Sequence, residues 1–118
     1  MKAYMWTLCF CLIIACQQQK WPDEALHGQW DSSSWINLNT QKEISSQLDF
    51  NFKSDGRYEL DYGTKLVEGK FWIESDYLHT IEDQQSEMKV KILSLNQDSL
   101  VIDMNRGGHM ERVILLKQ

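Results

Sequence analysis

The sequence predicts an all-β domain folded as an antiparallel meander of about eight strands. Apolar residues alternate with polar ones through most of the chain after residue 47, and short turn-like segments separate the alternating runs. No long stretch shows the periodicity of a helix. A meander with one apolar face can bury that face by closing into a barrel. A two-sheet sandwich is the alternative, and the number of strands does not separate the two architectures.

The chain begins with a short apolar segment that has the features of a secretory signal. Lys2 supplies a positive charge, and residues 4–15 carry no charge. The apolar region of a signal has about 7–15 residues, whereas a membrane-spanning helix needs about 20. Residues 1–15 are therefore predicted to be a cleaved signal peptide.

This segment ends in Ile13-Ile14-Ala15-Cys16, which resembles the lipobox of bacterial lipoproteins. The resemblance implies that a diacylglyceryl group is attached to the thiol of Cys16, which becomes the first residue of the mature protein. Two or three acyl chains on one residue make a stable anchor, whereas a single chain anchors only marginally. We therefore expect a lipid-anchored protein of the bacterial cell envelope. Gln17 in place of Asp resembles sorting to the outer membrane. An ordinary cleaved signal is the alternative.

Removing the 15 signal residues from 118 leaves 103, which is one domain with enough chain for a hydrophobic core. Cys9 and Cys11 leave with the signal, so the domain is expected to fold without an internal disulfide. Loss of Lys2 takes the formal charge from −5 to −6. This acidic balance argues against nucleic acid as a partner.

The mature chain divides into a polar tether and one folded domain. The tether covers residues 16–25, and the domain covers residues 26–118. Its first strand is expected at Gly28, and the alternating runs that follow are residues 48–52, 58–62, 71–73, 77–81, 88–92, 100–104 and 110–116. Ser54-Asp55-Gly56 joins two of these runs and predicts a hairpin turn. Residues 41–47 are compatible with a brief helical turn.

Gly28-Gln29-Trp30 resembles the Gly-x-Trp motif that opens the first strand of lipocalins. The layout of residues 26–117 is similar to that of small lipocalin-like lipoproteins of Bacteroidetes-type bacteria. The further residues that match this pattern are Phe50, Phe52, Asp55, Gly56, Tyr58, Gly69, Phe71, Ile92, Leu95 and Leu100. The resemblance implies an eight-stranded up-and-down barrel in which Trp30 closes one end. It also implies a late arginine packed over this Trp, for which Arg112 is the first candidate and Arg106 the second.

The resemblance implies non-catalytic binding of a small hydrophobic ligand inside the barrel. The pocket residues expected from the aromatic positions are Trp35, Phe50, Phe52, Tyr58, Tyr62 and Phe71. A barrel filled by these same side chains is the alternative. In that case the protein would be a protein-binding module of the envelope, of an inhibitor or immunity type.

The residue types that carry catalysis or bind metals do not form recognisable patterns. His27, His79 and His109 are far apart in the sequence and lack the spacing of metal ligands. His79 alternates with Leu78 and is expected on the outer face of its strand. Glu59 and Asp61 share a strand face that is expected to be solvated. We therefore expect no metal, no cofactor and no enzymatic activity.

Overall fold

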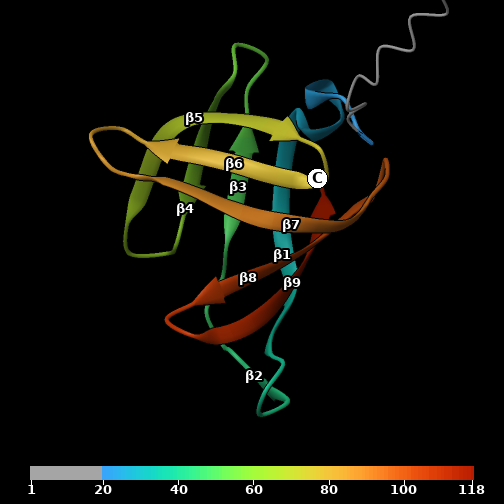
Figure 1. The fold of residues 1–118 in the computed structure, drawn as a ribbon, viewed down its shortest axis with the longest axis vertical. Helices are drawn as coiled ribbons and strands as arrows, with labels where there is room; N and C mark the ends of the chain where they lie inside the picture. The colour runs from blue at the N-terminus through green and yellow to red at the C-terminus, as the bar shows by residue number, and fades with distance from the viewer. Residues whose placement is uncertain (1–19) are drawn as a thin grey trace, which may run out of the picture.

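The computed structural model describes residues 20–118, and both the predicted signal peptide and Cys16 lie outside this range. Within it the chain forms one short 3-10 helix and nine strands (Figure 1). The elements are η1 (Asp23–Leu26), β1 (Gly28–Asn37), β2 (Lys42–Glu43), β3 (Asp49–Phe52), β4 (Arg57–Asp61), β5 (Leu66–Glu74), β6 (Tyr77–Glu82), β7 (Glu87–Leu95), β8 (Ser99–Arg106) and β9 (His109–Lys117). In this part of the chain, no helix has the length and apolar character needed to span a bilayer.

The strands form a closed antiparallel barrel. Strands β3 to β9 pair in sequence order, and β1 pairs with both β3 and β9. The β1–β9 pairing joins the two ends of the meander, so the barrel is confirmed and the sandwich alternative is wrong. The two-residue strand β2 pairs with β1 only and adds a short flap outside the barrel of eight strands.

The prediction of a brief helical turn over residues 41–47 is wrong. Residues 42 and 43 belong to β2 instead, after a tight turn. The side-chain Oδ1 of Asn37 accepts hydrogen bonds from the backbone N–H groups of Asn39 and Thr40, and Gln41 adopts a left-handed φ of 61°. An Asn side chain that satisfies backbone donors in this way favours a turn over a helix.

Two bulges determine which side chains face the interior. Trp30 and Trp35 are both buried, although strict alternation would place them on opposite faces of β1. The register of β1 against β9 shifts between Ser32 and Ser34, and this bulge turns both indoles inward. A second register shift, next to Ile92 in β7, acts in the same way on that strand.

The end of the barrel next to η1 is closed. Leu26 of η1 is completely buried, and its carbonyl accepts a 2.8 Å hydrogen bond from Nε1 of Trp30. The Asp23 carboxylate accepts a hydrogen bond from the backbone N–H of Ile73 at 2.9 Å and so fixes η1 to β5. Gly28 adopts a φ of 123°, a conformation that favours glycine, where the chain turns from η1 into β1.

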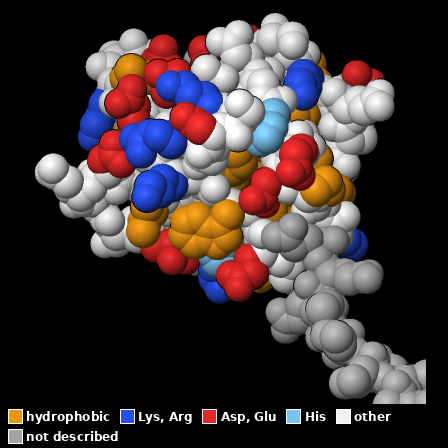
Figure 2. Space-filling model, turned by 90° about the horizontal axis from the view of Figure 1, so that it is seen from above, with side chains coloured by type: hydrophobic (Ala, Val, Ile, Leu, Met, Phe, Trp, Pro, Cys, Tyr) orange, Lys and Arg blue, Asp and Glu red, His pale blue; other side chains and the backbone are white. Residues whose placement is uncertain are grey.

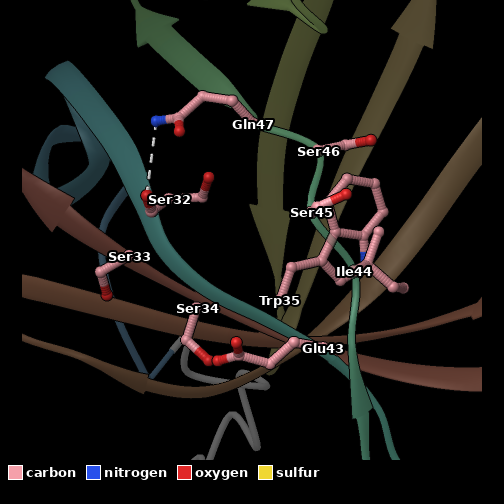
Figure 3. Close-up of a pocket in the computed structure, with 9 residues that line it drawn as sticks. All are labelled: Ser32, Ser33, Ser34, Trp35, Glu43, Ile44, Ser45, Ser46 and Gln47. Atoms are coloured by element: carbon pink, nitrogen blue, oxygen red, sulfur yellow. Dashed lines mark hydrogen bonds between the residues drawn. The ribbon is translucent and has the colours of Figure 1, made fainter.

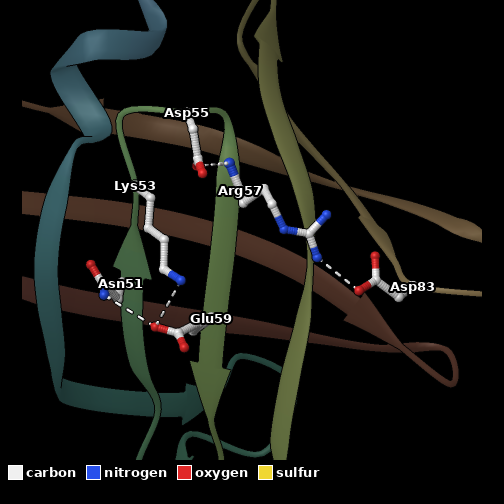
Figure 4. A network of polar contacts seen from close by, with 6 residues as sticks. All are labelled: Asn51, Lys53, Asp55, Arg57, Glu59 and Asp83. Atoms are coloured by element: carbon white, nitrogen blue, oxygen red, sulfur yellow. Dashed lines mark hydrogen bonds and ion pairs between the residues drawn. The ribbon is translucent and has the colours of Figure 1, made fainter.

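The outer face of the barrel is polar and carries both positively and negatively charged side chains. On β3 and β4, Glu59 accepts a hydrogen bond from Asn51 and pairs with Lys53, while Arg57 pairs with Asp83 at 2.7 Å (Figure 4). Seen from above, acidic and basic side chains are intermixed (Figure 2). Exposed pairs of this kind contribute little to stability.

Candidate functional site: a cavity in the barrel

A cavity of about 410 Å³ occupies the half of the barrel that lies away from η1. It is bounded by β4 and β6, by the ends of β1 and β8, and by the starts of β3, β5 and β7. Its lining residues are Trp35, Leu48, Phe50, Tyr58, Leu60, Tyr62, Lys65, Val67, Leu78, Thr80, Glu82, Met88, Lys89, Val90, Ile102, Met104, Asn105 and Arg106. We call the side of the cavity bounded by the exposed residues Tyr62, Lys65, Met88 and Arg106 the mouth.

Four of the six predicted pocket residues line this cavity. They are Trp35, Phe50, Tyr58 and Tyr62. Phe52 and Phe71 do not line it, and their assignment to the pocket is wrong. Their rings pack against each other at 4.8 Å, and Phe50 stacks on Phe52 at 5.0 Å. Phe52 and Phe71 therefore belong to the packed layer beneath the cavity.

This packed layer forms the floor of the cavity. It consists of fully or almost fully buried side chains at the η1 end of the barrel, including one from η1 itself, namely Leu26, Trp30, Phe52, Phe71, Ile73, Ile92, Leu100, Val113 and Leu115. The interior thus has two parts along the barrel axis: a filled part next to η1 and a hollow part at the mouth. The barrel is therefore neither wholly filled nor wholly hollow.

Gly69 is buried on β5, opposite Tyr58 on β4. A β-carbon at Gly69 would collide with the backbone carbonyl of Ile81 on the neighbouring strand β6. Glycine is therefore required by the close approach of β5 and β6.

The polar groups of the cavity are concentrated at the mouth. Burial raises the pKa of Tyr58, an effect that a side-chain hydrogen bond with Thr80 partly offsets, and Glu82 raises it further. Burial also raises the pKa of Tyr62, with Glu82 raising it and Arg106 lowering it. Both phenols consequently stay protonated at neutral pH and can donate hydrogen bonds. Thr80 and Glu82 were not predicted as pocket residues from the sequence, although Leu78, Thr80 and Glu82 alternate on one face of β6.

Arg106 is held in place at the mouth by Trp35 and Glu111. Its guanidinium carbon lies 5.2 Å from the centroid of the Trp35 ring, and its Nε lies 3.1 Å from Oε1 of Glu111. The same Oε1 accepts a 2.9 Å hydrogen bond from Nε1 of Trp35. The side chain of Glu111 is 3% exposed and that of Arg106 is 60% exposed. A buried carboxylate therefore anchors an exposed cation beside the cavity.

The residue over Trp30 is a lysine. Nζ of Lys117 lies 5.2 Å from the centroid of the Trp30 ring and donates a hydrogen bond to the His27 carbonyl at 2.7 Å. Arg112, predicted for this position, instead faces outward and makes two hydrogen bonds to Asp103, which raise its pKa. Arg106 does pack on a Trp, but on Trp35. The prediction of Arg112 was wrong because a strand position fixes the face, and Arg112 lies between the inward-facing Glu111 and Val113.

A smaller groove of about 120 Å³ lies outside the barrel, between the bulge of β1 and the segment that leads from β2 to β3 (Figure 3). Its lining is mainly hydroxyl and amide groups, from Ser32, Ser33, Ser34, Ser45, Ser46 and Gln47. The Ser32 hydroxyl already takes part in a hydrogen bond within the protein, because its Oγ accepts one from the backbone N–H of Leu48 at 2.9 Å.

His79 lies on the outer face of β6, as the alternation predicts, but it is buried there by its neighbours. Its ring stacks on Trp72 at 5.2 Å, and its Nδ1 lies 2.8 Å from a carboxylate oxygen of Glu87. Nε2 lies 3.6 Å from Glu74. Among residues 20–118 there is no cluster of three or more His, Cys, Asp or Glu side chains arranged to hold a metal ion.

The closed eight-stranded meander, the Gly-x-Trp opening and the cavity at one end define a lipocalin-like barrel. The solved structures include a similar one, a lipocalin-like protein from Bacteroides uniformis. The two share a TM-score of 0.60 and 17% sequence identity over 80% of this chain and 99% of that one. No protein-family model matches the sequence, and no curated protein matches it. The likeness is therefore one of fold.

Proposed function

We propose that this protein binds a small hydrophobic molecule in the barrel cavity without transforming it. The observation that carries this proposal is the cavity of about 410 Å³. Ligand pockets in proteins typically measure about 300–1,000 Å³ and are lined mainly by apolar side chains with a few polar groups. The apolar walls of this cavity, formed by residues such as Leu60, Val67 and Ile102, and its polar mouth match that description.

The proposal is tested by titration with the fluorescent apolar probe N-phenyl-1-naphthylamine. Leu60 points into the cavity, so Leu60→Trp is expected to fill it and weaken probe binding at least about tenfold, or about 1.4 kcal/mol. Leu66 lies on the adjacent strand and is 57% exposed. Leu66→Trp is therefore the matched control and should bind the probe as the parent does. Equal binding by a folded Leu60→Trp variant would contradict the proposal.

A protein-binding role is the second candidate, and exposed apolar side chains near the mouth favour it. Met88 is 62% exposed and Tyr62 is 42% exposed. Native mass spectrometry of the protein isolated from its own host distinguishes the two roles. A small molecule retained in the parent and lost in Leu60→Trp supports the ligand-binding role, whereas a protein retained by both supports the second.

We also propose that the protein is anchored to the cell envelope, at the outer membrane, through acyl chains on Cys16. The support is the sequence Ile13-Ile14-Ala15-Cys16 after a short apolar segment. Cys16→Ser should abolish acylation and leave the protein either uncleaved or free of the membrane. A Cys16→Ser variant that remained in the membrane fraction at the mature mass would refute the anchor.

A further inference from the structure

The mouth of the cavity carries both positively and negatively charged side chains. The charged residues that line the cavity are Lys65, Glu82, Lys89 and Arg106. Lys89 does not contribute its charge, since it pairs opposite His79 on the outer face and its Nζ lies 4.8 Å from the ring of Tyr77. The charges of Lys65 and Glu82 are opposite in sign, so the orientation of the hydrogen-bonding groups decides which ligand group fits.

Arg106 is the donor whose position is best fixed. The two oxygens of Glu111 engage its Nε and Nη2 at 3.1 Å, and the Trp35 ring supports one face of the guanidinium. A guanidinium carries five N–H donors, and Glu111 uses one edge of the group. The opposite edge, which carries Nη1, has no other hydrogen-bond partner among residues 20–118 and remains available to a ligand.

The protonated phenols add further donors. Tyr62 lies close enough to Arg106 for the guanidinium to lower its pKa, although burial and Glu82 keep it raised overall. A ligand group that reaches Arg106 therefore also lies near a phenol O–H. Glu82 is the one carboxylate that lines the cavity wall itself.

We propose that the ligand is an amphiphile, with an apolar body in the cavity and an anionic, acceptor-rich group, a carboxylate or a phosphate, bound by Arg106 at the mouth. This inference rests on the proposed function and names the chemical class of its ligand. Charge-assisted hydrogen bonds from a guanidinium to such groups are among the strongest in proteins. Because Glu111 and Trp35 hold Arg106 before the ligand arrives, little conformational entropy is lost when it binds.

The experiment compares dodecanoate, dodecyl phosphate, dodecanol and dodecylamine as competitors of N-phenyl-1-naphthylamine, each below its micelle concentration. We expect an anionic competitor to displace the probe at least about tenfold better than dodecanol, since charge-assisted, bidentate hydrogen bonds between a guanidinium and an anion are among the strongest in proteins. Comparison of dodecanoate with dodecyl phosphate identifies the preferred anion. A preference for dodecylamine would assign the recognition to Glu82 and overturn the proposal, as would equal affinities for all four.

The matched variants locate the preference. Arg106→Gln alone leaves the buried carboxylate of Glu111 without its cation. The double variant Arg106→Gln/Glu111→Gln is therefore tested beside it. A glutamine at position 111 can still accept the hydrogen bond from the indole N–H of Trp35. Both variants should lose the preference for the anion over dodecanol. Arg112→Gln removes an arginine that pairs with Asp103 on the outer face, and it should keep the preference. Retention of the preference by a folded double variant would overturn the proposal. Failure of the parent protein to bind the probe would instead refute the proposed function.

Discussion

The buried carboxylate of Glu111 is bonded to both Trp35 and Arg106, and Arg106 in turn lies over the Trp35 ring. The three side chains come from β1, β8 and β9, so they join the two strands that close the barrel to a third strand. Their contact therefore has a structural role as well as the proposed role in ligand recognition. The two roles can be separated by measuring stability and binding on the same variants.

Glu111→Ala should lower the free energy of unfolding by about 1–3 kcal/mol, the cost of leaving a buried hydrogen-bonding group without its partner. The unpaired group is the indole N–H of Trp35, whereas the exposed Arg106 can be hydrated. Glu111→Gln keeps an acceptor for Trp35 and should cost less. Urea unfolding gives both values. Equal losses in the two variants would show that the charge, rather than the hydrogen bond to Trp35, provides the stabilisation.

Phe52→Ala should destabilise the protein by about 3–5 kcal/mol, because it opens a void in the packed floor. Leu60→Ala should cost less than the about 2–5 kcal/mol typical of buried leucines, because Leu60 already borders a cavity. Chemical denaturation measures the two losses. A larger loss for Leu60→Ala would mean that the cavity is collapsed in solution.

Gly69→Ala should destabilise the barrel, since its new methyl group would collide with the Ile81 carbonyl and force β5 and β6 apart. We expect a loss above about 1 kcal/mol, which exceeds the typical single substitution. Gly63 lies in an exposed loop with no atom near its would-be β-carbon, and it adopts a φ of 93°. Gly63→Asn is the control, as asparagine tolerates positive φ. Thermal unfolding that ranked Gly63→Asn as the less stable variant would contradict this role of Gly69.

Asp31→Asn should raise Tm at pH 7. Burial, with the facing charge of Asp49 as a smaller cause, raises the pKa of Asp31 above its ordinary value of 3.8. The folded state therefore holds this proton more tightly than the unfolded chain does, and the ionised carboxylate destabilises the fold. This penalty is complete above the raised pKa and disappears as the pH falls through it to 3.8. The Tm difference between the variant and the parent should shrink over that range. Asp49→Asn should act in the same direction but less strongly.

The anchor proposed for Cys16 would face the mouth away from the membrane. The described chain begins beside η1, at the closed end of the barrel (Figure 1). The four steps between neighbouring α-carbons from Cys16 to Lys20 span at most about 14 Å. A nine-residue strand such as β5 is about 30 Å long, or somewhat less along a tilted barrel axis. The segment from Cys16 to Lys20 is thus too short to bring the mouth to the bilayer.

Single cysteines test this orientation, because residues 17–118 contain no cysteine. A fluorophore on Ser54→Cys, in the β3–β4 turn at the closed end, should be quenched by spin-labelled lipid. One on Thr64→Cys, between β4 and β5 at the mouth, should be quenched less. The reverse order would contradict the orientation even if the anchor itself is established.

Local patterns in the sequence predict the strands and the hairpin at Asp55-Gly56 correctly. They depend on alternation and turn chemistry, which act between neighbouring residues. The sequence places both Trp30 and Trp35 inside the barrel, but it does not predict the bulge at Ser32 that turns both inward, because this bulge becomes visible only when β1 pairs with β9. It likewise does not predict that Glu111 is buried, since its burial depends on Trp35, which is far away in the chain.

The same limit explains two errors: the prediction of Arg112 over Trp30, and the assignment of Phe52 and Phe71 to the pocket. Arg112 and Lys117 are both cations on β9, and only the register of that strand shows which of them reaches Trp30. Phe50 and Phe52 face the same way, so alternation cannot tell the wall of the cavity from its floor. The depth of a residue along the barrel axis depends on strand tilt and closure, which are properties of the complete sheet.

The division of the interior into a packed floor and a hollow mouth gives the two halves different freedom to change. Substitutions in the floor alter the folding equilibrium, because every side chain there is surrounded by others. Substitutions around the cavity alter its volume and polarity while the floor and the β1–β9 seam still hold the barrel closed. For the proposed ligand-binding role, selectivity can therefore be varied at positions such as Leu60, Val67 and Ile102 in a scaffold whose stability is set elsewhere.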